Sequence, residues 1–142
     1  MLHQLALALI LFAIGGMAWV TWGIFVRVSA SIFMHWAISY LAHTRGPSDW
    51  AVKDASVQGH NIAWLAIPTM GESWHGNHHA FPTSARHGLY PGQIDPGWWV
   101  IQGLEALNLV WDVQTPTTLP PRSNLIALTE RARNFQGKKS PL

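Results

Sequence analysis

The sequence contains no cysteine and few charged residues for its length. Of its 142 residues, 11% are Asp, Glu, Lys or Arg, whereas soluble domains carry about a quarter charged residues. Without thiols the chain has no disulfides, no thiolate metal ligands and no cysteine nucleophile, so a metal site must use histidine and carboxylate side chains. The net charge of +2, with no long basic run and no glycine-rich phosphate loop, argues against nucleic-acid binding.

Apolar residues are abundant instead, at 49% of the chain, with nine tryptophans. Residues 5–26 carry no charge, and the apolar character resumes after Arg27. A bilayer core needs about 20 apolar helical residues per crossing, so this stretch is too long for one straight span and short for two. We expect Gly15-Gly16 to divide it into a short helix, about 5–14, and a full transmembrane helix, about 17–43. A signal peptide is disfavoured, because no positive charge precedes the run.

Three histidines lie within five residues of one another in the middle of the chain. They are His75, His78 and His79, in the segment from Gly71 to Pro82. On a helix, residues three or four apart share a face, so His75 can lie beside either of the others, whereas adjacent His78 and His79 diverge. Buried imidazoles need partners, and an all-nitrogen cluster suits iron, zinc, copper or nickel. We therefore predict that this cluster binds metal.

This histidine segment, with Ser84-Ala85-Arg86 after it and Leu-Val-Trp-Asp-Val at residues 109–113, resembles the last part of the membrane-bound fatty acid desaturases. The resemblance is to the acyl-CoA desaturase type, most of all to its bacterial members, and runs from about residue 15 to residue 116. It implies an all-α fold, with integral membrane helices under a cytosolic helical cap, of which this sequence is a C-terminal fragment. In that family, histidines from three boxes and one further histidine hold a pair of irons.

The resemblance implies a role for individual residues. His75, His78 and His79 occupy the third-box positions and would be iron ligands, and His43 stands where the family has its further histidine near the end of the last membrane helix. Ser39 replaces an asparagine of the family, which puts in doubt a water-mediated contact to the metal. The first box, two histidines separated by four residues, and a second His-x-x-His-His do not occur in this sequence. About half of the ligand set is therefore not encoded.

Further polar residues are candidates for supporting roles. Glu72 can accept a ring proton from His75, as outer residues often do at metal sites, or it can be a surface carboxylate. His60 is interpreted as exposed, or as a hydrogen-bond partner of a ligand, rather than as a ligand. For His35 we favour a hydrogen bond between helices over metal ligation, and Arg27 is expected to snorkel or to pair.

Three segments follow from these patterns. Residues 1–43 form the membrane segment, residues 44–116 form a cytosolic cap that contains the histidine box, and residues 117–142 form a poorly ordered basic tail. By the positive-inside rule, the basic tail places the cap in the cytoplasm. The tail itself is expected to be attracted to anionic lipid of the bilayer.

Within the cap we expect two further helices, one before and one after the histidine box. An amphipathic helix should cover about 51–65, and a second helix should run from about 96, a proline suited to a first turn, to 111. Its tryptophans suit either the membrane interface or the core of the cap. The glycine- and proline-rich stretch 82–96 should be a loop, with Arg86 and His87 as exposed basic positions.

The resemblance also implies a reaction in fatty acid biosynthesis. The intact family enzyme uses a diiron centre, O₂ and electrons from a donor such as ferredoxin or cytochrome b5. It places a cis double bond in an acyl chain carried by CoA or by a lipid, and saturated carbon–hydrogen bonds require such metal–oxygen chemistry. We expect no catalysis by this chain alone unless the missing N-terminal half is supplied, for example as a separate chain. Two alternatives stay open: a non-catalytic truncated membrane remnant, and a related diiron hydroxylase or ketolase.

Overall fold

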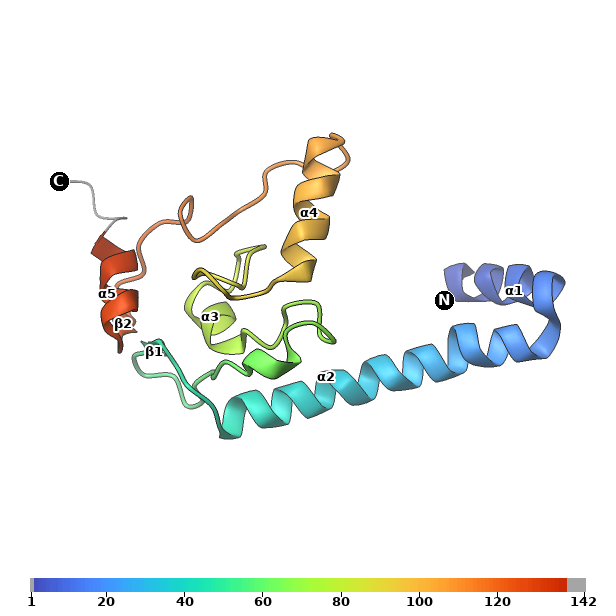
Figure 1. Ribbon diagram of the computed structural model, residues 1–142, viewed down its shortest axis with the longest axis horizontal. Helices are drawn as coiled ribbons and strands as arrows, with labels where there is room; N and C mark the ends of the chain where they lie inside the picture. The colour runs from blue at the N-terminus through green and yellow to red at the C-terminus, as the bar shows by residue number, and fades with distance from the viewer. Residues whose placement is uncertain (1, 138–142) are drawn as a thin grey trace. The chain divides into compact units, whose positions relative to one another are not determined.

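The computed structural model describes residues 2–137, which belong to two compact units that meet between Ala37 and Ile38. Most of the ordered elements are helices, as predicted, and one small antiparallel sheet accompanies them (Figure 1). The first unit is entirely helical. The second unit contains the sheet, the remaining helices and the histidine box.

The N-terminal helical stretch, whose last residues belong to the second unit, breaks once and turns back. Helix α1 covers Leu2–Val20, a π-helical stretch covers Thr21–Val26, and α2 covers Arg27–Thr44. Inside α1, Gly15 (φ −144°, ψ 17°) and Gly16 (φ 65°, ψ −160°) leave helical geometry. The conformation of Gly16 is open to glycine because it has no Cβ. The break therefore lies at the glycine pair to which the sequence points.

Side-chain contacts join the two arms of this turn. Arg27 donates from Nε to the carbonyl of Gly23 at 2.8 Å and from a terminal nitrogen to Oε1 of Gln4 at 3.2 Å. The side chain of Leu11 lies so close to Gly23 that a Cβ there would be 2.6 Å from its Cδ1. The start of α1 therefore lies against the residues that follow the break (Figure 1).

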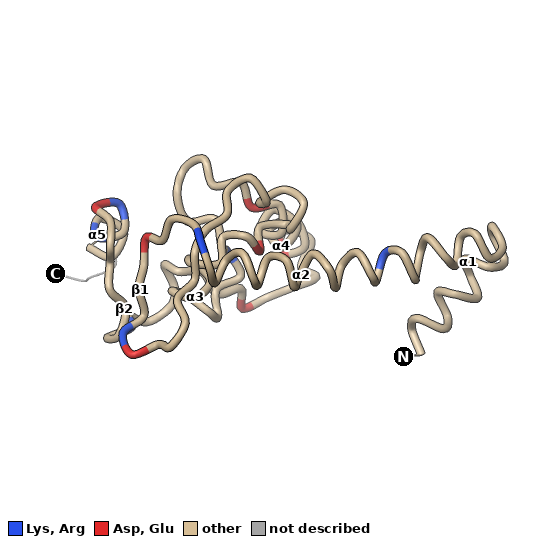
Figure 2. The backbone as a smooth tube through the Cα atoms, turned by 90° about the horizontal axis from the view of Figure 1, so that it is seen from below, with Lys and Arg blue, Asp and Glu red and all other residues tan. Residues whose placement is uncertain are grey.

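The surface of these helices is apolar and exposed. Trp22 is 70% exposed, Phe33 71% and Trp36 70%. Figure 2 shows almost no charge along α1 and the first part of α2, apart from Arg27. By length and composition, Leu2–Thr44 is the one helical stretch among residues 2–137 that can cross a membrane.

The core of the second unit is built from segments that are far apart in sequence. Strand β1 (Trp50–Val52) pairs antiparallel with β2 (Leu125–Ala127), with Trp50 opposite Ala127. Helix α5 (Glu130–Gly137) follows β2 directly. Around the sheet lies one cluster of buried residues: Trp50, Ala80, Phe81, Leu89, Tyr90, Leu125 and Ala132.

The C-terminal segment is ordered, contrary to the expectation from its sequence. Residues 117–142 were expected to form a disordered tail, but this segment contains β2 and α5, with Leu125 and Ala132 buried in the core. The tail is ordered by pairing with β1, more than seventy residues earlier in the chain, and no local composition reveals such a partner. Lys138 and Lys139, the end of the expected basic tail, lie outside the described residues.

The expected helix over 51–65 is also wrong. The chain forms β1 and then a turn in which Asp54 has a positive φ of 63°, and only a short 3-10 helix, Ala63–Leu65, follows. The side chain of Gln58 explains the turn, because it accepts from the N–H of Val52 at 2.9 Å and donates to the carbonyl of Val52 at 2.8 Å. This side chain thus satisfies backbone groups that a helix would have paired.

Helix α4 covers Pro96–Ala106 and begins where it was predicted. The buried carboxylate of Asp95 accepts from the N–H of Trp98 at 3.0 Å and caps the helix. The helix ends before residue 111, because Asn108 takes a left-handed conformation (φ 55°) and the N–H of Leu109 returns to the carbonyl of Leu104.

Candidate metal centre

Three imidazoles of the second unit converge on one point. Helix α3 (His75–Ala80) carries His75 and His79 one turn apart, and His43 lies in the last turn of α2. The Nε2 atoms form a nearly equilateral triangle, at 3.0 Å between His43 and His75 and at 3.1 Å for each of the other two pairs. His43 thus lies beside two of the three histidines of the box.

The triangle cannot be satisfied by hydrogen bonds among its own atoms. Each neutral ring nitrogen is either a donor or an acceptor, so among three mutually close Nε2 atoms at least two share a role and oppose each other. Burial, and then the charges of the neighbouring imidazoles, lower the pKa of His75 to about 4. Burial and His43 also lower the pKa of His79. Three imidazole nitrogens this close to one another suit a cation, because imidazole is a common metal ligand.

The size of the triangle also fits a first-row metal ion. Nitrogen–metal bonds are about 2.1 Å long, and an ion at that distance from all three Nε2 atoms, which are 3.0–3.1 Å apart, would have nitrogen–metal–nitrogen angles of about 95°. Such angles are close to those between adjacent corners of an octahedron. Three histidine ligands on one face leave further positions open, as in the non-haem iron sites that activate O₂.

His78 lies apart from this triangle. Its ring centroid is 5.6 Å from that of His75 and 6.1 Å from that of His79. Among residues 2–137, the ring nitrogens that lie within 4.8 Å of one another as a group are those of His43, His75 and His79. A nearer ring is that of His87, at 5.0 Å. Burial, and then the charge of His87, lower the pKa of His78. The role of His78 as a ligand remains a prediction.

Two of the expected supporting residues make no hydrogen bond to an imidazole within residues 2–137. Glu72 is exposed, and its charge raises the pKa of His78 against the larger lowering effects of burial and His87. Ser39 is half-buried, one turn before His43, and its hydroxyl makes no hydrogen bond to any residue within 2–137. The supporting roles of Ser39 and Glu72 remain predictions.

His60 connects the two ligand-bearing elements through its main chain. Its N–H donates to the carbonyl of Ala42 at 2.8 Å, and its own carbonyl accepts from the N–H of Gly76 at 3.1 Å. Ala42 precedes His43, and Gly76 follows His75. The backbone of His60 thus holds the end of α2 against the start of α3. The sequence had suggested a role only for the side chain of His60.

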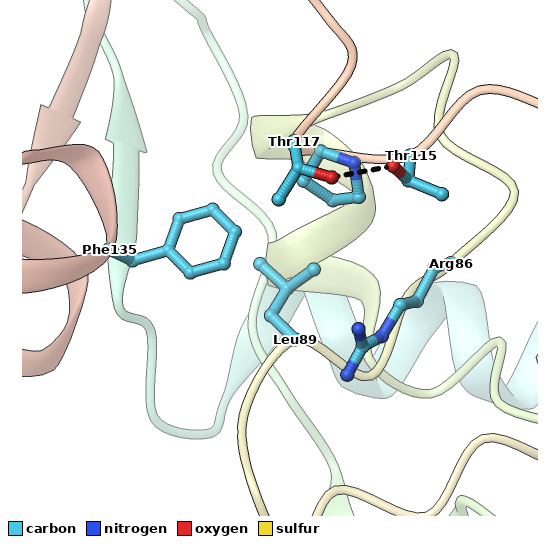
Figure 3. A pocket seen from close by; sticks show the side chains of 6 residues that line it. Arg86, Leu89, Thr115, Thr117 and Phe135 are labelled. Carbon is cyan, nitrogen blue, oxygen red and sulfur yellow. Dashed lines mark hydrogen bonds between the residues drawn. The ribbon is translucent and has the colours of Figure 1, made fainter. Parts of the chain in front are cut away.

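A small pocket lies beside the loop after α3 but is not lined by any of the histidines. It has a volume of about 110 Å³ and is lined by Arg86, Leu89, Thr115, Thr117 and Phe135, with Pro116 (Figure 3). Arg86 was expected to be exposed but is half-buried, because its Nε donates to the carbonyl of Gly88 at 2.7 Å. Ligand pockets usually measure about 300–1,000 Å³, so this pocket is too small for an acyl chain.

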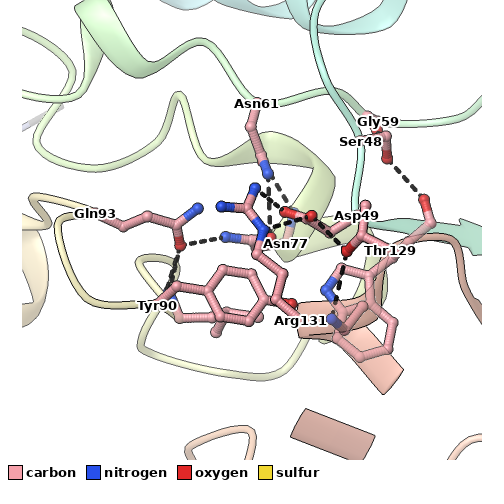
Figure 4. Close-up of polar contacts among 12 residues, drawn as sticks. Ser48, Asp49, Gly59, Asn61, Asn77, Tyr90, Gln93, Thr129 and Arg131 are labelled. Atoms are coloured by element: carbon pink, nitrogen blue, oxygen red, sulfur yellow. Dashed lines mark hydrogen bonds and ion pairs between the residues drawn. The ribbon is translucent and has the colours of Figure 1, made fainter. Parts of the chain in front are cut away.

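Sequence reasoning missed Asn77, which stands between the histidines of the box. Asn77 is 1% exposed, and its N–H donates to Oδ1 of Asn61 at 3.2 Å. Its Nδ2 donates to the carbonyl of His87 at 2.8 Å and to Oε1 of Gln93 at 3.0 Å (Figure 4). The polar side chain inside the box therefore anchors α3 to the loop that follows it.

Arg122 was also missed, because it lies in the segment expected to be disordered. One terminal nitrogen of Arg122 donates to the carbonyls of His79 and Ala80, both at 2.9 Å. These are carbonyls of the last turn of α3, and cationic side chains stabilise such groups. Arg122 thus secures the C-terminal end of the helix that carries the histidines.

Gly59 packs closely against the ring of His79 and the backbone of His75. A Cβ there would lie 2.8 Å from the carbonyl oxygen of His75 and 2.9 Å from ring atoms of His79. We expect Gly59→Ala to displace the ring of His79 and to raise the dissociation constant for cobalt(II) at least about tenfold. An absorption titration of the full chain in detergent measures this constant.

The matched control for this prediction is Gly103→Ala, on α4. A Cβ at Gly103 meets no described atom within 4 Å, and alanine is favoured in a helix. Its cobalt(II) affinity should equal that of the unaltered chain. Equal affinity in the Gly59→Ala variant would show that the ring of His79 does not need this close approach.

Known proteins that resemble this chain are named as desaturases. The chain is 42% identical over 115 residues to "Delta-9 acyl-lipid desaturase 2" of Arabidopsis thaliana, an alignment that covers 81% of this chain and 36% of the relative. It is 41% identical over 115 residues to "sn-1 stearoyl-lipid 9-desaturase" of Synechocystis, covering 81% and 35%. It is 40% identical over 117 residues to "Icosanoyl-CoA 5-desaturase" of Limnanthes douglasii, covering 82% and 32%.

The chain spans about a third of the length of these curated relatives. No protein-family model and no solved structure matches it. Relatives named for acyl-lipids and for acyl-CoA have similar identity, so the expected acyl-CoA type is not singled out. Over at least 81% of its residues, the chain is homologous to one portion of the fatty acyl desaturases.

Proposed function

We propose that this chain is the C-terminal part of a membrane-bound diiron fatty acyl desaturase. The observation that carries the proposal is the triangle of Nε2 atoms of His43, His75 and His79, with sides of 3.0–3.1 Å, in a chain homologous to desaturases. In the proposed reaction, two adjacent methylenes of an acyl chain each lose one hydrogen. O₂ is reduced to two waters, with two electrons from the acyl chain and two from an external donor.

Iron, when bound, supplies with O₂ the oxidising power that acid and base side chains lack. The chain's own residues hold the three imidazoles in place for it. Helix α3 keeps His75 and His79 one turn apart, the main chain of His60 holds α3 against the end of α2, and Arg122 secures the last turn of α3. Partial burial of His75 keeps its ring neutral, which a nitrogen ligand must be.

A diiron centre needs more ligands than the three imidazoles that converge here. The printed sequence contains neither a pair of histidines separated by four residues nor a second His-x-x-His-His. We propose that the remaining ligands come from a segment that this sequence does not contain, either upstream in the same protein or in a separate chain.

We also propose that α1 and α2 lie in the bilayer, with the second unit on the cytoplasmic side. The helix from residue 17 to residue 44 is about 42 Å long at 1.5 Å per residue, which exceeds a hydrocarbon core of about 30 Å. Of the nine Lys and Arg residues, only Arg27 precedes Thr44. Such a bias favours a cytoplasmic location for the part that follows.

Complementation of a desaturase-deficient host tests the proposed function. The chain is expressed alone, and also fused behind the N-terminal two-thirds of the Arabidopsis relative, and unsaturated fatty acids are measured by gas chromatography. We expect product from the fusion and none from the chain alone. A fusion carrying His75→Ala is the control and should give none.

Two results would contradict the proposal. Product from the chain alone would show that no further ligands are needed. A fusion that accumulates in membranes with bound iron, yet forms no unsaturated product, would show that this chain does not support desaturation.

A further inference from the structure

The imidazole of His78 lies outside the triangle and makes no hydrogen bond to any residue within 2–137. Its Nδ1 is buried without a partner in the described part of the chain. Burying such an atom unpaired costs free energy. The ring centroid of His87 lies 5.0 Å away, with an angle of 62° between the ring planes. This second pair of imidazoles therefore needs an explanation of its own.

The ring distances and angles within the triangle can be compared with those of the pair His78 and His87. Its three ring pairs have centroids 4.7, 4.7 and 5.1 Å apart and interplanar angles of 74°, 62° and 75°. Those rings bring their Nε2 atoms to 3.0–3.1 Å. The values for His78 and His87 fall within the same ranges, so these two rings are close enough to share one metal ion.

His87 is held in position by hydrogen bonds of its main-chain N–H and carbonyl groups. Its N–H donates to Oδ2 of Asp95 at 2.8 Å, and its carbonyl accepts from Nδ2 of Asn77 at 2.8 Å. Asp95 is 4% exposed and Asn77 is 1% exposed. Asn77 directly precedes His78 on α3, so the loop that carries His87 is tied to the helix that carries His78.

We infer that His87 is a metal ligand that pairs with His78 at a second metal position beside the triangle. The inference rests on the proposed metal centre and adds to it a ligand from outside the histidine box. Two imidazole nitrogens suit a divalent first-row ion such as iron or zinc. Water or a further segment completes the coordination. The position is next to the first one, because the ring centroids of His75 and His78 are 5.6 Å apart.

Metal-dependent protection of individual histidines tests the inference. The full chain in detergent micelles is titrated with zinc(II) and treated with diethyl pyrocarbonate, and modification of each histidine is measured by mass spectrometry. We expect His78 and His87 to become protected together, over one range of zinc concentration. We expect His43, His75 and His79 to become protected together as a separate group. After His78→Ala, His87 should lose its protection.

The deciding variant is His87→Gln. The anchors of His87 are main-chain groups, so the loop should keep its position, and thermal unfolding checks this. We expect zinc protection of His78 to require at least about tenfold more zinc, with the triangle unchanged. His35→Gln, an exposed position in the first unit, is the control and should change neither group.

Each contrary outcome has a distinct meaning. If His78 is protected at the same zinc concentration in the His87→Gln variant, or if His87 is modified at every zinc concentration, His87 is not a ligand and the inference fails while the triangle stands. If zinc protects none of the five histidines, the proposed metal centre fails and the inference fails with it.

Discussion

Replacing His75 with alanine is expected to reduce bound iron to the background level. The Nε2 of His75 forms two of the three sides of the triangle, to His43 at 3.0 Å and to His79 at 3.1 Å. Removing it leaves two nitrogens, one from each of two helices, and a face of three ligands can no longer form. Iron per chain, measured by elemental analysis of the purified full chain in detergent, gives the result.

The same substitution should leave the stability of the iron-free protein almost unchanged. At least two of the three Nε2 atoms in the metal-free triangle are both donors or both acceptors, and such a pair opposes each other. Losing the ring of His75 removes this unfavourable contact as well as the favourable packing of the ring, so the two effects on stability offset each other. A histidine that served only in packing would instead lose about 1 kcal/mol or more of unfolding free energy. Thermal unfolding of the iron-free variant therefore separates ligation from packing.

Exposed His35 provides the matched control. His35→Ala lies in the first unit and should retain full iron content. His43→Ala should lose as much iron as His75→Ala, because the two helices contribute to one site. Normal iron content in the His43→Ala variant or in the His75→Ala variant would contradict the triangle as the metal centre.

Replacing Arg131 with alanine is expected to cause a large loss of stability in the second unit. Its guanidinium donates from two nitrogens to the two carboxylate oxygens of Asp49, both at 2.7 Å (Figure 4). Asp49 is 2% exposed, and Thr129 donates to the same carboxylate at 2.8 Å. The guanidinium also lies 4.7 Å from the ring centre of Tyr90. Without Arg131, a buried carboxylate would remain with one hydroxyl donor.

Breaking one side of a buried ion pair costs about 3–5 kcal/mol. Because the side chain of Arg131 is 53% exposed, we expect a loss near the lower end of that range, about 3 kcal/mol. Urea unfolding of the full chain in detergent, followed by tryptophan fluorescence, measures it, since buried Trp50 packs in the same core.

Arg133→Ala is the control, since Arg133 is exposed on the same helix. Surface substitutions of this kind usually change stability by less than about 0.5 kcal/mol. If Arg131→Ala and Arg133→Ala had equal effects, the ion pair would contribute nothing beyond a surface charge, and α5 would be held by its apolar contacts alone.

Signals within a few residues were readable in the sequence. The glycine pair marks the break in α1, Pro96 opens α4, and the three-and-four spacing of the box places His75 beside His79. Each of these features depends on the geometry of one helical turn or on the φ of one residue. The adjacent positions of His78 and His79 likewise predict that their rings diverge, as the structure shows.

The errors concern segments whose order depends on distant partners. Residues 117–142 were read from their prolines and basic residues as a disordered tail, yet β2 pairs with β1 and Arg131 pairs with Asp49, 82 residues away. The stretch 51–65 has a helical apolar pattern, but pairing with β2 and the side chain of Gln58 compete for its backbone groups. Local propensity is overridden wherever such tertiary contacts are available.

The helical character, the long apolar stretch and the candidate metal ligands could be read from composition and spacing, because these signals act over a few residues. Which imidazoles meet depends on contacts between segments that are far apart in the chain. His43 reaches His75 and His79 across more than thirty residues, while His78 turns toward His87. The physical reason is that main-chain hydrogen bonds through His60 and the buried side chain of Asn77 set these distances, and both join segments that the sequence keeps apart.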